Sequence, residues 1–132
     1  MPNEINFTDS DRLVEIGLKN KIYGYIFSNL VKDRTNKVFV KSEIKTVKNL
    51  RGNFSGKPTF ANSNALIKHA RQKFGQEIVI IGCGGVFEVQ DAIAKFKCGA
   101  DLVQLITGMV FEGPQIAGEI NQQLTKKLQL VK

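Results

Sequence analysis

Short apolar runs along the chain alternate with longer segments in which apolar residues recur at helical spacing. The apolar runs span Tyr23 to Phe27, Ile78 to Ile81 and Leu102 to Leu105, and each ends at small or polar residues. Glycine-containing turns follow the second and third runs, at Gly82-Cys83-Gly84-Gly85 and at Thr107-Gly108. The repeated order of strand, turn and helix is typical of parallel α/β units, so the sequence predicts an α/β fold.

The segments of helical spacing predict four helices with recognisable ends. Polar residues able to cap a helix precede the first two, and glycines follow the second and third. The first helix should have its cap within Thr8-Asp9-Ser10-Asp11 and end at Asn20, and the second should have its cap at Asn62 or Ser63 and end at Gly75. The third should end at Gly99. The last should run from about Pro114 to Gln129, with Ile116, Ile120, Leu124 and Leu128 on its inward face. The long connection after the first strand has no strong periodicity, which is more often a sign of function than of a passive linker.

At 132 residues the chain has the length of one ordinary domain, and we expect residues 1–132 to form a single domain. A complete (β/α)8 barrel needs roughly 250 residues, so the chain is too short to form one. Three parallel strands cannot close into a barrel, and their unpaired edges favour association. We therefore expect either that further strands come from outside this sequence or that the chain pairs with a second copy of itself.

Composition and charge narrow the classes of function. No apolar run approaches the roughly 20 residues of a membrane span, so we expect no membrane segment in this chain and a soluble protein. The net charge is +7, with basic residues dense in 37–51 and 126–132, yet no aromatic residues interleave with them in a pattern suited to stacking on bases. A solvated surface explains this charge better, and we expect no nucleic-acid partner.

The two cysteines and the single histidine do not form a metal site. Cys83 and Cys98 have no CxxC partner and His69 stands alone, so we expect free buried thiols and no metal. Cys83 precedes a predicted helix whose N-terminus would lower the pKa of the thiol, and a nucleophilic role is the alternative. Because Cys83 lacks a neighbouring base, the free thiol is the favoured interpretation.

The glycine turns are the best candidates for a binding site. Glycine at the carboxyl end of a strand allows backbone N–H groups to approach an anion, and a following helix N-terminus adds partial positive charge. Two adjacent turns of this kind form a cradle for a phosphate, so the sequence indicates a nucleotide or a phosphorylated cofactor. The alternative is that Gly82, Gly84 and Gly85 only permit tight strand-to-helix connections, and the spacing alone leaves both interpretations open.

Several short motifs occur in an order that resembles a known family. They are Phe54-Ser55-Gly56-Lys57-Pro58, Ile80-Ile81-Gly82 with Gly84-Gly85-Val86, Gln90-Asp91-Ala92, Gly99-Ala100 with Leu102-Val103-Gln104-Leu105 and Thr107, and Glu112-Gly113-Pro114. From about Phe7 to Leu128 the chain is similar to the carboxyl-terminal part of class 2 dihydroorotate dehydrogenase. The resemblance covers only the last third or so of such an enzyme, and it implies a partial TIM (β/α)8 barrel made of carboxyl-terminal βα units.

The resemblance also implies roles for individual residues. Class 2 enzymes are quinone-linked, use FMN, and oxidise dihydroorotate to orotate in pyrimidine biosynthesis. The family's FMN-binding positions match Ser28, which would touch the flavin, and Gly56, Gly84, Gly85, Ile106 and Thr107, which would hold the phosphate end. Its substrate-binding positions match Asn29, which would hydrogen-bond the orotate ring, and Leu30. The full enzyme would have dihydroorotate, orotate and a quinone as partners and would lie in the cytoplasm or at the inner membrane.

Several positions depart from the family pattern. Leu30 stands where the family usually has threonine, Ile106 where it has tyrosine, and Asn53 where it has glycine. Pro2 occupies the register of the family's flavin-contacting lysine, and the catalytic serine of class 2 has no counterpart in the chain. We therefore expect no catalytic residue here and no activity from the chain alone. The alternative to a part of an enzyme is a non-catalytic module that binds phosphate or flavin and has lost the chemistry.

Overall fold

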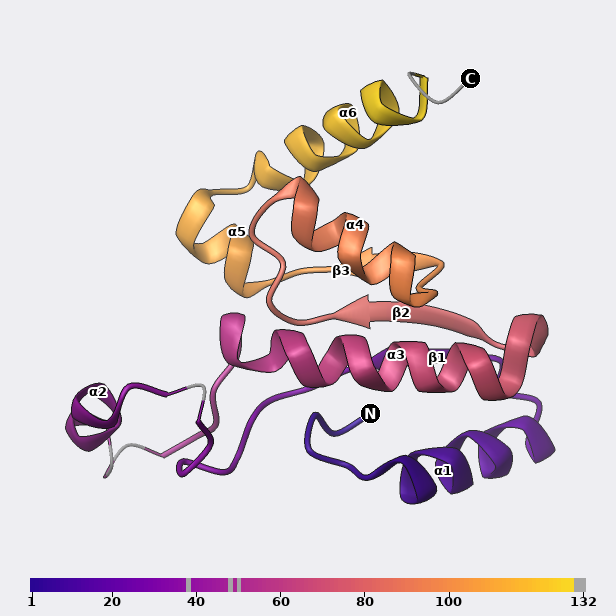
Figure 1. Cartoon of the computed structure of the whole chain (residues 1–132), viewed down its shortest axis with the longest axis horizontal. Helices are drawn as coiled ribbons and strands as arrows, with labels where there is room; N and C mark the ends of the chain where they lie inside the picture. The colour runs from indigo at the N-terminus through magenta and orange to yellow at the C-terminus, as the bar shows by residue number, and fades with distance from the viewer. Residues whose placement is uncertain (38, 48, 50, 130–132) are drawn as a thin grey trace.

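The computed structural model describes residues 1–37, 39–47, 49 and 51–129, with the side chains of 43 and 127–129 outside this description. At its centre is a parallel sheet in the order β1-β2-β3 (Figure 1), formed by Gly24–Phe27, Val79–Cys83 and Leu102–Gln104. The register places Ile26 beside Ile81, and Ile81 beside Leu102. The three predicted strands are confirmed, and the carboxyl ends of all three lie at one edge of the sheet.

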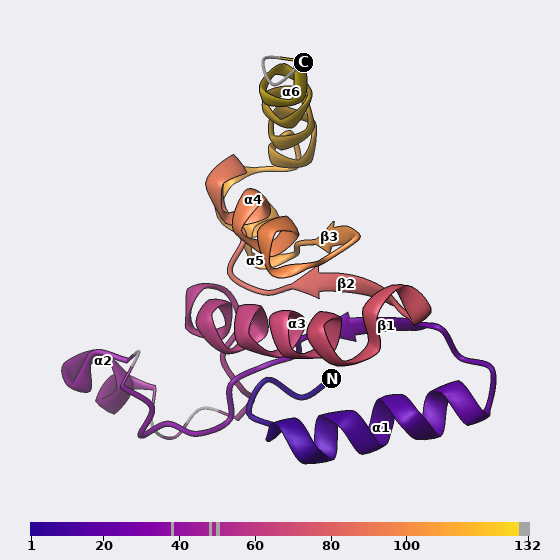
Figure 2. The same ribbon diagram turned by 45° about the vertical axis from the view of Figure 1, so that its right-hand side comes forward.

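Helices connect the strands and cover one side of the sheet. They are α1 (Phe7–Lys19), α2 (Lys41–Thr46), α3 (Phe60–Phe74), α4 (Val89–Cys98), α5 (Thr107–Glu112) and α6 (Ile116–Gln129), with the 3-10 turns η1 (Lys57–Thr59) and η2 (Gly75–Glu77). α3 contacts β1 and β2, and α4 contacts β3, α3 and α6. Figure 2 shows α3 and α4 side by side along the sheet. The chain is thus an α/β structure built from consecutive units of a partial (β/α)8 barrel.

The two faces of the sheet differ in how they are covered. The face toward the helices carries the core, whose buried side chains include Val14, Tyr25, Phe27, Leu66, Ile67 and Ile80. On the opposite face Ile26, Val79 and Leu102 are 44%, 45% and 56% exposed, since successive strand residues point to alternate sides. The described residues leave this face uncovered, as expected for strands that do not complete a barrel.

The first helix begins earlier than the sequence predicts. Asn6 is the N-cap, and its side-chain oxygen accepts a hydrogen bond from the backbone N–H of Asp9 at 2.8 Å. The predicted cap within Thr8-Asp9-Ser10-Asp11 is therefore wrong, because these residues already form the first turns. The predicted end at Asn20 is confirmed, since its backbone N–H donates to the Gly17 carbonyl at 2.9 Å.

The second predicted helix, α3, also begins before its predicted cap. The 3-10 turn η1 carries Pro58 and leads directly into the helix at Phe60, where the fixed φ of proline favours the first turn. A cap at Asn62 or Ser63 is therefore wrong, and the Ser63 hydroxyl instead lies buried beneath the strand ends. The predicted end at Gly75 is confirmed.

The carboxyl-terminal third contains one helix that the sequence analysis missed. α4 ends at Gly99 in the left-handed conformation, as predicted. α5 is a short helix between β3 and α6, too short to show a periodic pattern. α6 begins at Ile116, where Ile116 and Ile120 are buried and Leu124 packs against them. The predicted inward position of Leu128 lies outside the described side chains.

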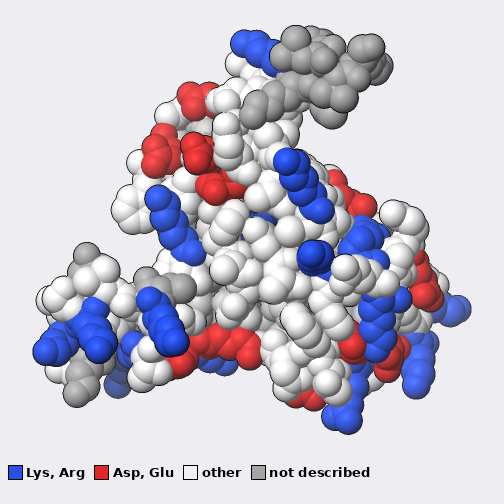
Figure 3. All heavy atoms as spheres, in the orientation of Figure 1, with Lys and Arg blue, Asp and Glu red and all other residues white. Residues whose placement is uncertain are grey.

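Charged side chains are mixed over the face drawn in Figure 3. Basic residues lie over α2 and over the region of α1 and α3, with acidic residues among them. No helix in the described ranges combines the length and the apolar composition required to cross a membrane.

Arg71 holds together the amino-terminal edge of the sheet. Its guanidinium donates to the carbonyls of Gly99 at 2.9 Å, Ile78 at 3.2 Å and Gly75, and it pairs with the Asp101 carboxylate at 2.5 Å. That carboxylate also accepts the Ile80 N–H at 2.7 Å. One side chain therefore ties the end of α3 to β2 and to the turn between α4 and β3.

We predict that Arg71→Leu lowers the free energy of unfolding by about 2–3 kcal/mol, because its carbonyl and carboxylate partners lose a charged donor. Urea denaturation followed by circular dichroism measures this change. Arg12→Leu is the control, because Arg12 is 71% exposed and pairs only with Asp9 among the contacts described for it, and such pairs contribute less than about 1 kcal/mol. Equal losses in the two variants would contradict the role of Arg71.

Candidate functional site

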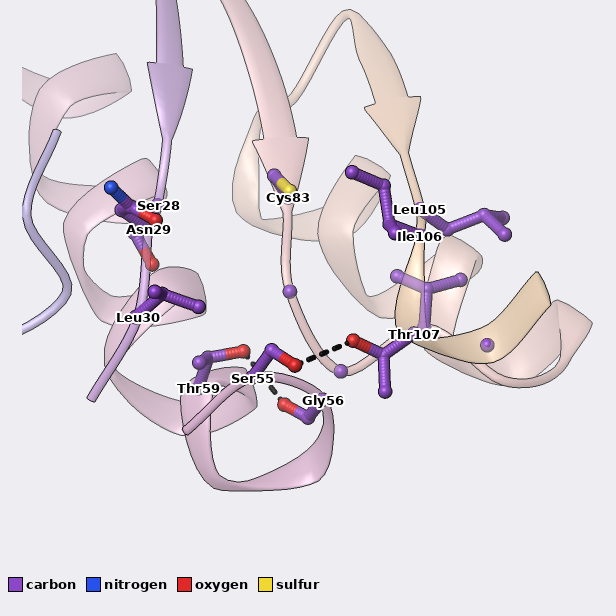
Figure 4. Close-up of a pocket in the computed structure, with 14 residues that line it drawn as sticks. Ser28, Asn29, Leu30, Ser55, Gly56, Thr59, Cys83, Leu105, Ile106 and Thr107 are labelled. Atoms are coloured by element: carbon purple, nitrogen blue, oxygen red, sulfur yellow. Dashed lines mark hydrogen bonds between the residues drawn. The ribbon is translucent and has the colours of Figure 1, made fainter. Parts of the chain in front are cut away.

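A pocket of about 240 Å³ lies at the carboxyl edge of the sheet. It is bounded by the three strand ends and the segment before α3 (Figure 4). The lining consists of Ser28, Asn29, Leu30, Ser55, Gly56, Thr59, Cys83, Gly84, Gly85, Val86, Leu105, Ile106, Thr107 and Gly108. All eight residues that the sequence assigns to cofactor or substrate are in this lining, namely Ser28, Asn29, Leu30, Gly56, Gly84, Gly85, Ile106 and Thr107. The structure therefore brings the predicted site residues together.

The end of β1 supplies the first wall of the pocket. The Ser28 N–H donates to the Cys83 carbonyl at 3.0 Å, which continues the pairing with β2 one residue beyond the strand. The Ser28 hydroxyl accepts a hydrogen bond from the buried Asn3 side chain at 2.6 Å. Asn29 follows with an exposed side chain. Its amide can both donate and accept, so Asn29 is the residue on this wall best suited to bind a polar ligand.

The long connection after β1 returns to the pocket and supplies the second wall. Val31 and Phe54 exchange backbone hydrogen bonds at 2.8 and 2.9 Å, and this bridge places the following Ser55 and Gly56 opposite the strand ends. The Thr107 hydroxyl at the start of α5 donates to Ser55 Oγ at 2.9 Å. The long connection therefore contributes directly to the pocket, as expected.

The turn after β2 is closely packed and requires glycine. Gly84 and Gly85 have φ values of +106° and +75°, a region that side chains other than glycine rarely adopt. A Cβ atom would lie 2.3 Å from Thr59 Oγ1 at Gly84, and 2.5 Å from Phe60 Cβ at Gly85. Tight turn geometry is thus sufficient reason for both glycines. The Gly85 N–H has no hydrogen-bond partner within the described part of the chain, so the turn keeps a donor for a ligand.

Gly56 approaches the third strand end in the same way. Its φ is +77°, and a Cβ atom would lie 2.9 Å from the Thr107 methyl group. The Gly56 carbonyl accepts the N–H of Thr59 at 3.0 Å and its hydroxyl at 2.7 Å. These bonds fix the loop, so the backbone of Gly56 and the hydroxyl of Thr107 lie side by side at the pocket.

Cys83 lines the pocket but is not an activated nucleophile. Burial raises the pKa of its thiol, and the smaller opposing effect comes from Lys95 and the chain's amino group. α4 begins only at Val89, so its N-terminus does not directly follow Cys83. The helix N-terminus expected to lower the pKa of Cys83 is therefore not beside the thiol, which leaves the free thiol as the favoured interpretation. Cys83 and Cys98 are free thiols, half-buried rather than fully buried. Among the described residues no group of three His, Cys, Asp or Glu side chains could hold a metal ion.

The sequence analysis missed Lys95, a buried lysine below the strand ends. Its side chain is fully buried and donates to Ser63 Oγ at 3.0 Å and Asn64 Oδ1 at 2.9 Å. Burial lowers the pKa of Lys95 from 10.5 to about 8. The available signal was its spacing, because Lys95 continues the three-residue repeat of the buried Val89 and Ala92 along α4.

The departures from the family pattern fall in different places. Leu30 and Ile106 both line the pocket, and Ile106 is 61% exposed there. Asn53 and Pro2 are exposed residues that do not line it. Two apolar side chains therefore replace polar ones at the pocket itself.

The family model described as dihydroorotate dehydrogenase matches residues 1–128 of the chain. The chain belongs to the dihydroorotate dehydrogenase family. Similar curated proteins named dihydroorotate dehydrogenase (quinone) occur in Christiangramia forsetii, Rhizobium johnstonii and Bartonella henselae, with identities of 39%, 36% and 44%. The matches cover 87%, 89% and 64% of this chain but only 32%, 31% and 23% of those proteins. The resemblance to class 2 is confirmed, and the chain spans less than a third of the curated relatives it matches.

Solved dihydroorotate dehydrogenase structures confirm the fold. Two structures of the enzyme from Eimeria tenella, one ligand-free and one in complex with ferulenol, superimpose with TM-scores of 0.83 and 0.82 at 21% and 22% identity. Each match covers 99% of this chain and about a third of the other, at 35% and 33%. The three strands and their helices therefore have the fold of about a third of such a barrel enzyme, which confirms the predicted partial TIM barrel.

We predict that Gly85→Ala destabilises the chain by about 2–3 kcal/mol, because the new methyl group meets Phe60 and the backbone is strained. Gly118→Ala is the control, since nothing lies within 4 Å of a Cβ there and alanine stabilises a helix by about 0.5–1 kcal/mol relative to glycine. Urea denaturation of both variants measures the difference. A Gly85→Ala variant as stable as the wild type would contradict the packing of the turn.

We also predict that Lys95 makes the stability of the chain rise with pH between about 8 and 10.5. In this window the folded chain has released the Lys95 proton while the unfolded chain still holds it, so the unfolded state binds more protons and stability increases with pH. Urea denaturation across the window, compared with Lys95→Met, isolates this effect from the opposite contribution of Cys83, whose pKa is raised. A difference between the two proteins that does not change with pH would contradict the assignment.

Proposed function

We propose that the chain forms the carboxyl-terminal, FMN-phosphate-binding part of a dihydroorotate dehydrogenase. The observation that carries this proposal is the single pocket lined by all eight residues that match the family's cofactor and substrate positions. Family membership supports it independently, because the family model matches residues 1–128. The complete enzyme oxidises dihydroorotate to orotate with FMN and passes the electrons to a quinone. Within that enzyme, residues 1–132 form a single part of the barrel domain. The enzyme lies in the cytoplasm or at the surface of the inner membrane.

The pocket suits the phosphate end of FMN better than the whole cofactor. Its volume of about 240 Å³ lies just below the roughly 300–1,000 Å³ of pockets that enclose a complete ligand of drug size. Gly56, Gly84 and Gly85 allow a phosphate to approach the backbone, and the Thr107 hydroxyl adds a side-chain group beside them. The Gly85 N–H is the donor left for a phosphate oxygen, and Ser28 is the residue that would contact the flavin.

The substrate would lie at the β1 end of the same pocket. Asn29 offers an amide that can donate to and accept from the orotate ring, while Leu30 supplies no hydroxyl. FMN, when bound, supplies the hydride-accepting chemistry. This chain contributes binding and orientation but no catalytic base, so it does not turn over dihydroorotate alone. The uncovered face of the sheet is the surface for its partner, which is the remaining part of the barrel or a second copy of the chain.

The second candidate is a flavin-binding module without catalysis. Leu30 and Ile106 favour it, because both place apolar side chains at pocket positions where the family has polar ones. The two candidate functions predict different results when the chain is mixed with the part of a related enzyme that it lacks. Restored oxidation of dihydroorotate supports the enzyme, and flavin binding without turnover in that mixture supports the module.

We predict that the chain quenches FMN fluorescence in a saturable way and binds FMN at least about tenfold more tightly than riboflavin, which lacks the phosphate and its charge-assisted hydrogen bonds. Fluorescence titration with each flavin measures both affinities. Equal affinity for the two flavins would contradict a phosphate site, and the absence of FMN binding would contradict the proposed function.

Substitutions at Ser55 test the location of the phosphate without disturbing a glycine. Ser55 is exposed at the rim and receives the Thr107 hydrogen bond at 2.9 Å. Ser55→Asp introduces a negative charge beside the phosphate and should weaken FMN binding, with a smaller effect on riboflavin. Ser55→Asn is the neutral control of similar size. Gly85→Asp is a poorer probe, because any side chain at Gly85 meets Phe60 whatever its charge.

A further inference from the structure

The buried hydroxyl of Ser63 bridges the ends of two strands. Ser63 Oγ lies 3.0 Å from the carbonyl oxygen of Phe27 at the end of β1 and 2.8 Å from that of Cys83 at the end of β2. Ser28 and Gly84, the next residues along each strand, both line the pocket. The position of one hydroxyl is therefore linked to the separation of two pocket walls.

Lys95 holds this hydroxyl from below. Its ammonium group donates to Ser63 Oγ at 3.0 Å and to Asn64 Oδ1 at 2.9 Å, and it lies 4.8 Å from the centre of the Phe60 ring. A lysine that donates to Ser63 leaves the serine's own proton for the strand-end carbonyls. Charge on the first donor strengthens the second hydrogen bond in such a chain.

Gly82 in the middle of β2 makes room for the lysine. A Cβ atom on Gly82 would lie 2.7 Å from the Lys95 side chain, and 3.1 and 3.3 Å from Ile67 and Ala100. Glycine inside a strand weakens the strand and commonly marks a close approach of another group. Here the group is Lys95, so Gly82 leaves space for the lysine side chain rather than for a ligand in the pocket.

We propose that Lys95 is a positioning residue for the flavin-phosphate site, acting through Ser63 on the carboxyl ends of β1 and β2. The identity of the ligand in this inference rests on the proposed function, whereas the contacts of Lys95 are independent of it. Lys95 is buried among uncharged groups on α3, where its partners are Ser63, Asn64 and the Phe60 ring. Phe60 in turn packs against Gly85, so the lysine supports the turn from two sides.

The ionisable groups around Lys95 are few. Asp91 and Cys98 lie on its own helix, Cys83 faces it from β2, and the amino group of Met1 interacts with Cys83. Their effects on Lys95 are smaller than that of burial, which lowers its pKa to about 8. Loss of the ammonium charge above that pH weakens the donation to Ser63. The FMN affinity of the wild type should therefore fall several-fold between about pH 7 and about pH 9.

The test compares Lys95→Met and Ser63→Ala with the control Lys97→Met, which removes the same charge from an exposed position on the same helix. Hydrogen exchange of the Ser28 amide, which donates to the Cys83 carbonyl, reports on the strand ends in the chain without ligand. We expect exchange about tenfold faster and FMN binding about tenfold weaker in Lys95→Met and Ser63→Ala, with Lys97→Met unchanged. The fall in affinity with pH should disappear in Lys95→Met.

The proposal is overturned if Lys95→Met and Ser63→Ala both keep the wild-type exchange rate and the wild-type FMN affinity. It is also overturned if the FMN affinity of Lys95→Met still falls with pH. If Lys95→Met does not fold, Ser63→Ala decides, because it removes a single hydroxyl. If the wild type binds no FMN, the proposed function fails, and the exchange rates alone decide whether Lys95 positions the strand ends.

Discussion

The parallel pairing of three short strands is the constraint on which the site depends. Because Ile26, Ile81 and Leu102 are in register, the residues that follow β1, β2 and β3 emerge at one edge. Residues from three distant parts of the chain thereby share a pocket of about 240 Å³. Parallel strands require long crossovers, and two of these crossovers, carrying α3 and α4, also bury the helix-facing side of the sheet.

The two edges of the sheet are held by different chemistry. At the amino-terminal edge Arg71 is 15% exposed and pairs with Asp101, so a full charge is matched by an opposite charge. At the carboxyl edge Lys95 is fully buried, and the hydrogen bonds described for it go to the neutral oxygens of Ser63 and Asn64. A buried cation without a carboxylate in direct contact is costly. The hydrogen bonds to Ser63 and Asn64 offset part of this cost and place the charge directly beneath the strand ends.

The sequence predicted features that follow from local stereochemistry or from strand ends. Gly75 and Gly99 end helices where predicted, since glycine adopts backbone angles unfavourable for other residues. The eight site residues meet because they follow parallel strands or the long connection. The wrong predictions concern polar side chains that can either cap a helix or form other hydrogen bonds. Asn6 was missed among neighbouring residues that also make good caps, and Ser63 was predicted as a cap although tertiary packing buries it.

The two ends of the pocket are constrained by packing to different degrees. The end at the glycine turns is built from backbone, glycine packing and a few hydroxyls, and a side chain at Gly56 or Gly85 would meet Thr107 or Phe60, which already occupy the space. The end at β1 is lined by the side chains of Asn29, which is exposed, and Leu30, which is half-buried. Leu30 is not among the atoms nearest to a Cβ at Gly84 or Gly85, so a change at Leu30 leaves the packing of the glycine turn intact. Folding therefore constrains the residues of the glycine turns more tightly than those that follow β1.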